Sequence, residues 1–252
     1  MNLQITLKNN KDVHVNPESR QSTNEENKFR TGQTIECSKI GRKKQTEFRI
    51  IGGNINTFPI NKYVSNKMKA DKLKQLICNY RADVVTFSEH NLNITKVPME
   101  NRPDVTMEGW RKNNILKMSC LEQGSDMYSL GGNGVISLDD AAKMMIQFGH
   151  DTKKLGRWTW CTYKLKQGHN LTIVSCYRPS ESQITYKVQL AQLANNEDAD
   201  TNRYDHHSSW YLDLKDVLES KISRGDHIIV VGDFNENLEN SHTRIRKLMN
   251  EL

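Results

Sequence analysis

The sequence contains no long apolar run and no closely spaced cysteines, and each absence excludes a class of protein. No segment approaches the ~18 apolar residues that a membrane span needs, and the N-terminus lacks the basic-then-apolar pattern of a signal peptide. The five cysteines are odd in number and show no spacing typical of a zinc ribbon or redox site, so we expect reduced, mostly buried thiols. These absences predict a nuclear or cytoplasmic protein that does not bind a membrane.

Apolar residues are also scarce for a chain of 252 residues. They make up 36% of the sequence, or about 42% with the 14 glycines, against the ~45–50% usual in globular domains. Some part of the chain must therefore be poorly packed. Residues 1–47 show no sustained period of 2 or 3.6 and are dominated by polar side chains, so we expect a disordered polar and basic leader before one domain at 48–252.

The net charge of +6 is concentrated near the N-terminus. Residues 1–50 hold ten Lys and Arg against six Asp and Glu, whereas the remaining 26 basic residues are nearly balanced by 24 acidic ones. A basic tail can hold a phosphate backbone, but solubility explains the charge equally well. Charge is therefore weak evidence for nucleic-acid binding by the folded part.

Hydrophobic periodicity predicts strands and helices throughout residues 48–252. The expected strands cover residues 48–55, 82–87, 131–138, 157–165, 171–176 and 227–231. The expected helices cover residues 63–80, 208–225 and 241–252. Residues 180–207 are polar and irregular, and we expect them to run over the surface.

Three of the predicted strands end in compact polar motifs. These motifs are Asn54-Ile-Asn56, Ser88-Glu89-His90 and Gly232-Asp-Phe-Asn235. A site that cleaves phosphodiesters needs a hard carboxylate for Mg²⁺, together with amides or carboxylates that aim the attacking water. Taken singly, each motif is also an ordinary strand-ending turn. Their value lies in their occurrence together and in this order.

The ordered motifs resemble those of the endonuclease/exonuclease/phosphatase superfamily, which includes DNase I, the apurinic/apyrimidinic endonucleases and the endonucleases of non-LTR retrotransposons. The resemblance covers residues 48–252 and extends to a glycine-led strand at 131–138 and to Tyr177-Arg-Pro179. Gly232-Asp-Phe-Asn235 matches the family motif without change and is the most specific of the set. Leu155-Gly-Arg-Trp158 looks like sequences of the retroelement-linked branch.

The resemblance implies an α+β fold of the DNase I type, in which two mixed β-sheets pack face to face in a four-layer sandwich with flanking helices. It further implies that Glu89, supported by Asn56, binds Mg²⁺, with Mn²⁺ as an alternative. Asp233 would orient or deprotonate the attacking water. The residues implied to position the phosphate of a DNA substrate are Asn54, Tyr177 and Asn235.

The superfamily finishes with a strand that carries Ser-Asp-His, and no such motif follows Asn235. His242 begins a predicted helix, and the pair His206-His207 lies in a polar loop, so we expect these three side chains on the surface. We therefore expect a domain that is incomplete at its C-terminus, with an open edge in its second sheet and with weak or no activity.

Three functions remain open at this point. The first is a retroelement-type endonuclease that acts on DNA. The second is a phosphatase or phosphodiesterase for inositol or lipid phosphates, because the same superfamily hosts both activities. The third is a non-enzymatic relic or interaction module, which the missing histidine supports. The sequence around Tyr177 and the basic leader favour DNA.

Overall fold

A computed structural model describes residues 4–5, 47–60, 64–122, 126–196, 206–236 and 243–252. One sheet contains β1 (Gln4–Ile5), β9 (His227–Asp233), β8 (Asn170–Tyr177), β7 (Trp158–Lys164) and β6 (Met145–His150), in that order. The other contains β2 (Ile50–Asn54), β3 (Val84–Ser88), β5 (Asn133–Leu138) and β4 (Asn114–Ser119). The helices are α1 (Val64–Tyr80), α2 (Pro103–Thr106), α3 (Asp139–Met144), α4 (Ile184–Asn196), α5 (His206–Ile222) and α6 (Arg244–Glu251), with short 3-10 turns at Met99–Asn101 and Lys166–Gly168.

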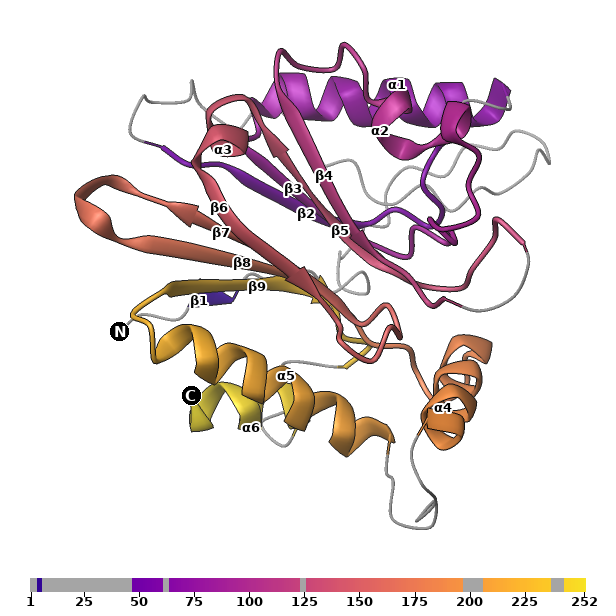
Figure 1. Ribbon diagram of the computed structural model, residues 1–252, viewed down its shortest axis with the longest axis vertical. Helices are drawn as coiled ribbons and strands as arrows, with labels where there is room; N and C mark the ends of the chain where they lie inside the picture. The colour runs from indigo at the N-terminus through magenta and orange to yellow at the C-terminus, as the bar shows by residue number, and fades with distance from the viewer. Residues whose placement is uncertain (1–3, 6–46, 61–63, 123–125, 197–205, 237–242) are drawn as a thin grey trace, which may run out of the picture.

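The two sheets form the middle layers of a four-layer sandwich (Figure 1). Helices α1 and α2 cover the outer face of the four-stranded sheet, and α5 and α6 cover the outer face of the five-stranded sheet. Both sheets mix parallel and antiparallel neighbours. The predicted α+β sandwich of two mixed sheets with flanking helices is therefore confirmed.

Strand β3 shows how the apolar sequence builds the sandwich. Its side chains alternate between the two faces, as the period of a strand requires. Val84 packs between the sheets with Val135 and Ile173, whereas Val85 packs beneath α1 with Ile77. Each fully buried aliphatic side chain of this kind contributes about 1.5–3 kcal/mol relative to an exposed one. Burial on both faces explains the continuous apolar run in the sequence.

The outer layer of α5 and α6 packs on the five-stranded sheet through large side chains. Trp210 and Leu214, one helical turn apart on α5, lie against Val174 of β8 and Ile228 of β9. Leu248 of α6 joins the same cluster. The apolar stripe that predicted the α5 helix is the face that is buried.

A glycine brings the two sheets close together near one end. A Cβ added at Gly52 of β2 would lie 2.3 Å from the Cγ1 of Val231 on β9, so no larger residue fits without a shift. Ser175 of β8 donates a hydrogen bond of 3.1 Å to the carbonyl oxygen of Phe87 on β3. These contacts place the ends of β2, β3, β8 and β9 at one end of the sandwich.

The predicted strands and helices are present with bounds that differ by a few residues, but one expectation is wrong. Residues 184–196, expected to be irregular, form α4, which stands at the end of the sandwich (Figure 1). Buried Leu193 packs there against Leu121 and Leu155. The buried stripe of this helix is narrow and includes the polar residues Thr185 and Gln189, so apolar periodicity did not reveal it. Strands β1, β4 and β6 and helices α2 and α3 were also not predicted.

Most of the expected leader lies outside the described residues, so its disorder and the domain boundary stay predictions. Gln4 and Ile5 form β1 and pair in parallel with Ile229 and Val230 of β9. Strand β9 is therefore paired on both sides over these two residues.

The cysteines agree with a reduced protein where they are described. Cys78, Cys120, Cys161 and Cys176 are free thiols, and all except Cys78 are buried. Cys37 lies outside the described residues. None of the helices in the described ranges is both long and apolar enough to cross a membrane.

Candidate active site

Four strands deliver polar residues to one end of the sandwich. Strand β2 ends at Asn54, which pairs with Ser88 at the end of β3, so Glu89 follows directly. Strands β8 and β9 end at Tyr177 and Asp233, which also pair with each other. Asn54 Nδ2 donates a hydrogen bond of 3.1 Å to Asp233 Oδ2, and this bond joins the two sheets at the site.

The loop after β2 is held against the loop after β3. The Asn54 Oδ1 atom accepts a hydrogen bond of 2.9 Å from the backbone N–H of Asn56, which makes an Asx turn. The N–H of Thr57 donates to the carbonyl oxygen of Glu89 at 2.6 Å. Lys69 of α1, which the sequence did not single out, donates from Nζ to the Asn56 carbonyl oxygen at 2.5 Å. Partial burial lowers the pKa of Lys69.

Residues with positive φ gather at these loops. Glu89, Asn91 and Asn235 have φ values of 55°, 54° and 48°, and Asn56 and Thr57 have values of 41° and 82°. Such angles are uncommon outside glycine and cost on the order of 1–3 kcal/mol where the conformation is strained. Their concentration at one set of strand ends is typical of a functional site.

The side chain of Tyr177 approaches the site from the buried interior and not from the surface. Its side chain is only 1% exposed, and its hydroxyl donates to Gln183 Oε1 at 3.3 Å. Burial, and then the nearby carboxylates of Glu89 and Asp233, raise the pKa of the Tyr177 hydroxyl, so it stays protonated. Gly131 leaves room for this ring, since an added Cβ there would lie 2.8 Å from Tyr177 Cε1.

Arg178 ties the turn after β9 to the end of β8. Its Nε donates to the Phe234 carbonyl oxygen at 2.7 Å and its Nη2 to the Asn235 carbonyl oxygen at 3.2 Å. In return, Asn235 Nδ2 donates to the Arg178 carbonyl oxygen at 2.7 Å. Arg178 also pairs with Glu236 at 3.2 Å. The Tyr177-Arg-Pro179 motif contained this arginine, but nothing in the sequence indicated that it clamps the Asp233 turn.

His90, beside Glu89, is a structural residue and not a metal ligand. Its Nδ1 accepts a hydrogen bond of 3.1 Å from the Leu92 N–H, so its Nε2 carries the proton and donates to the Ser119 carbonyl oxygen at 2.8 Å. Burial lowers the pKa of His90 to about 4. Both ring nitrogens are thus already occupied.

The oxygen donors at the strand ends suit a hard cation. Within the described ranges, no three His, Cys, Asp or Glu side chains are grouped to hold a metal. Mg²⁺ needs less, because it keeps several waters and binds one or two carboxylates together with substrate phosphate. Half-buried Glu89 and exposed Asn56 fit that requirement. The side chains of His206 and His207, and His242 as a whole, lie outside the described part.

A separate groove of about 680 Å³ lies at the far end of the four-stranded sheet. Its lining includes Asp104, Lys143 and Asn114, where β4 begins. The site lies beyond the other end of that sheet, since Ser119 at the end of β4 aligns through β5 with Ser88. The groove is therefore distinct from the candidate active site.

Neither a protein-family model nor a curated protein matches the chain. Similar solved structures include an AP endonuclease from Archaeoglobus fulgidus, with 12% identity and a TM-score of 0.48 over 81% of this chain and 69% of that one. An endonuclease/exonuclease/phosphatase family protein from Leptotrichia buccalis shares 15% identity, with a TM-score of 0.40 and coverages of 61% and 63%. A Bacteroides thetaiotaomicron mannosyl-6-phosphatase shares 9%, with a TM-score of 0.44 and coverages of 81% and 70%. The chain thus spans 63–70% of the length of these structures, and identities this low leave its substrate open.

Proposed function

We propose that this chain is a Mg²⁺-dependent phosphodiester hydrolase of the endonuclease/exonuclease/phosphatase superfamily, in its retroelement-linked branch, and that it acts on DNA. The observation that carries the proposal is the 3.1 Å hydrogen bond between Asn54 and Asp233, residues 179 positions apart. This bond brings the first and last polar motifs of the sequence together between the two sheets. Glu89 comes directly after β3, and Tyr177 is the last residue of β8. These strands neighbour β2 and β9, so both residues lie at the same end of the sandwich.

Glu89 and Asn56 are the residues that would hold Mg²⁺. The bound cation would supply a Lewis acid for a phosphate oxygen and lower the pKa of a coordinated water. Asp233 would orient the attacking water and accept its proton. Its two oxygens each accept one hydrogen bond, from the Asn235 N–H at 3.1 Å and from Asn54 Nδ2 at 3.1 Å. The carboxylate is thereby fixed, yet it keeps lone pairs for a water.

Two exposed amides are suited to binding the phosphate. Asn54 and Asn235 each use one N–H of the side-chain amide within the protein, and each retains a second one. Donors fixed in this way stabilise the negative charge that develops on a phosphate during attack. Because the amides lie at an exposed rim, a long polymer can reach them. The basic leader and the sequence around Tyr177 also favour DNA as the substrate.

The direct test is nicking of supercoiled plasmid by the full chain, in Mg²⁺ and in EDTA. We expect slow nicking that needs Mg²⁺ and is lost in Asp233→Ala. The matched control is Asp216→Ala, which removes an exposed carboxylate in the middle of α5. Equal nicking by both variants would contradict the assignment of Asp233.

Two small substrates separate the alternatives. Bis-p-nitrophenyl phosphate reports phosphodiester hydrolysis, and p-nitrophenyl phosphate reports phosphomonoester hydrolysis. Asp233-dependent cleavage of the monoester without nicking would replace DNA by a phosphomonoester such as an inositol or lipid phosphate. A folded chain that cleaves neither compound nor plasmid would contradict the enzymatic proposal and favour a non-catalytic role.

A further inference from the structure

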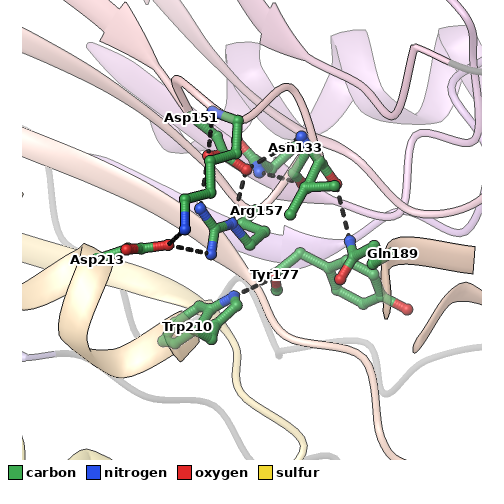
Figure 2. Close-up of polar contacts among 10 residues, drawn as sticks. Asn133, Asp151, Arg157, Tyr177, Gln189, Trp210 and Asp213 are labelled. Atoms are coloured by element: carbon green, nitrogen blue, oxygen red, sulfur yellow. Dashed lines mark hydrogen bonds and ion pairs between the residues drawn. The ribbon is translucent and has the colours of Figure 1, made fainter. Parts of the chain in front are cut away.

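A buried group of charges centred on Arg157 lies next to Tyr177 (Figure 2). Arg157 is 1% exposed and contacts Asp151 through Nε and Nη2, at 2.7 and 2.8 Å. Its Nη1 donates to Asp213 of α5 at 2.7 Å. Lys153 also pairs with Asp213, at 3.3 Å. Burial opposes the charge on Arg157, but the two carboxylates more than offset it, and the pKa of Arg157 is raised.

Fold stability alone is a weak reason to keep such a group. Buried ion pairs are often replaced by apolar residues without loss of stability, because desolvation cancels much of the attraction between the charges. They do constrain geometry, however, since a planar guanidinium accepts few arrangements of its partners. The position of Arg157 between β7 and α5 therefore calls for a geometric explanation.

That explanation lies in the backbone of Tyr177. The Tyr177 N–H donates to the Arg157 carbonyl oxygen at 2.8 Å. The Tyr177 carbonyl oxygen accepts a hydrogen bond of 3.3 Å from Trp210 Nε1. Trp210 and Asp213 lie three residues apart on α5 and so share one face of the helix. Figure 2 shows the Trp210 side chain directed toward Tyr177 and the Asp213 side chain directed toward Arg157.

Trp210 also contacts the turn that carries Asp233. Its ring packs edge-on against Phe234, with centroids 5.9 Å apart, and against Trp158 at 5.8 Å. Trp210 is fully buried, so its indole has no alternative partner in solvent. A single side chain of α5 thus contacts the ends of both β8 and β9.

We propose that Arg157, Asp213 and Trp210 are positioning residues: the Arg157–Asp213 ion pair docks α5 so that Trp210 holds Tyr177 in place beside Glu89. The role in catalysis rests on the function proposed above. The positional role does not, and it can be measured separately. Leu155-Gly-Arg-Trp158, noticed in the sequence only as a branch feature, acquires a physical role in this way.

The catalytic part is tested with a double-mutant cycle on bis-p-nitrophenyl phosphate. Trp210→Phe keeps an aromatic ring but removes the N–H donor. We expect it to lower kcat about tenfold with little change in KM, because small misplacements at a site are costly. In a Tyr177→Phe background the same substitution is expected to change kcat less than twofold. Equal losses of kcat in both backgrounds would show that Trp210 does not act through Tyr177 and would overturn the proposal.

The positional part is tested without activity, by ¹⁹F NMR of the full chain labelled with 3-fluorotyrosine. The Tyr177 resonance is assigned by its loss in Tyr177→Phe, and exposed Tyr128 provides an internal reference. We expect Trp210→Phe and Asp213→Asn to shift the Tyr177 resonance, and Trp160→Phe, a substitution elsewhere on β7, to leave it in place. Asp213→Asn is the gentler variant, because Asp213 is 25% exposed.

An unmoved Tyr177 resonance in folded Trp210→Phe and Asp213→Asn would overturn the positioning role, whatever the activity. Shifted resonances in a chain that hydrolyses nothing would instead retain the positioning role and reject the proposed function.

Discussion

Tyr177 lies between two polar regions that differ in nearly every physical respect. On one side, the strand-end residues Asn54 and Asn235 are exposed and keep unused N–H donors, and the loops around them include positive φ values. On the other side, Arg157 and Asp151 are buried, and all three nitrogens of the Arg157 guanidinium donate to carboxylates. The open region has spare binding capacity, and the closed region has little.

The difference suggests that the two regions have separate roles. Strained conformations persist only where the surrounding structure fixes them. Part of that support comes from the buried hydrogen bonds of Tyr177 with Arg157 and of Arg178 with the turn after β9. We therefore expect substitutions in the closed region to affect folding and those in the open region to affect ligand binding.

The largest expected effect is the loss of stability in Asp151→Ala. This carboxylate accepts two bonds from Arg157 and one each from the N–H groups of Lys153 and Leu155. Its removal leaves a buried guanidinium with one carboxylate partner, which typically costs about 3–5 kcal/mol. The free energy of unfolding in urea measures the loss. The control is Asp140→Ala, which breaks an exposed pair with Lys143. A similarly small loss of stability in both variants would contradict the contrast between the buried and the exposed region.

Glu89→Gln tests the open region. We expect Mg²⁺ to raise the unfolding midpoint of the native chain, since a ligand at 100 times its Kd stabilises by about 2.7 kcal/mol. The Glu89→Gln variant should fold, because the side chain at this position is only half-buried, but it should lose most of this Mg²⁺ effect. Glu122→Gln, which alters an exposed pair with Lys154, should retain it. A Mg²⁺ shift that survives in Glu89→Gln would remove Glu89 from the metal site.

The contact between Gly52 and Val231 gives a smaller effect, which concerns both the stability of the sandwich and the geometry of the site. Gly52→Ala places a methyl group against Val231 and should destabilise the chain by about 1–3 kcal/mol through overpacking. It should also separate Asn54 from Asp233. The neighbouring Gly53 has open space where a Cβ would lie, so Gly53→Ala is the matched control. Combining Gly52→Ala with Val231→Ala should restore part of the stability; a double variant no more stable than the single one would contradict the packing explanation.

The fold was predictable where sequence period and burial agree. The continuous apolar run at β3 and the stripe on α5 each predicted an element that is present. Strand β6 was missed because it is an edge strand with exposed Ile146 and Phe148, so its apolar residues do not mark a buried face. Helix α4 was missed because its buried stripe is narrow.

The candidate site was predictable as a set of strand-end motifs, and the structure brings Asn54, Glu89, Tyr177 and Asp233 together. Its supports were not predictable. The contacts of Trp210 with Tyr177 and of Arg157 with Asp213 join residues 33 and 56 positions apart, and periodicity within one element cannot specify such pairs. The Lys69 contact with the loop after β2 likewise depends on how α1 docks.

The smallest expected effect compares one residue type in both kinds of surroundings. Burial raises the pKa of the Cys161 thiol from about 9 to about 12, whereas Cys78 is exposed on α1. Above pH 9 the unfolded chain releases the Cys161 proton and the folded chain keeps it, so the stabilising contribution is complete below pH 9 and is lost as the pH rises toward 12. The expected loss between pH 9 and 10 is about 1 kcal/mol. Urea unfolding at both pH values should show this loss reduced in Cys161→Ala and unchanged in Cys78→Ala; the same pH dependence in all three proteins would mean that water reaches the interface between the sheets.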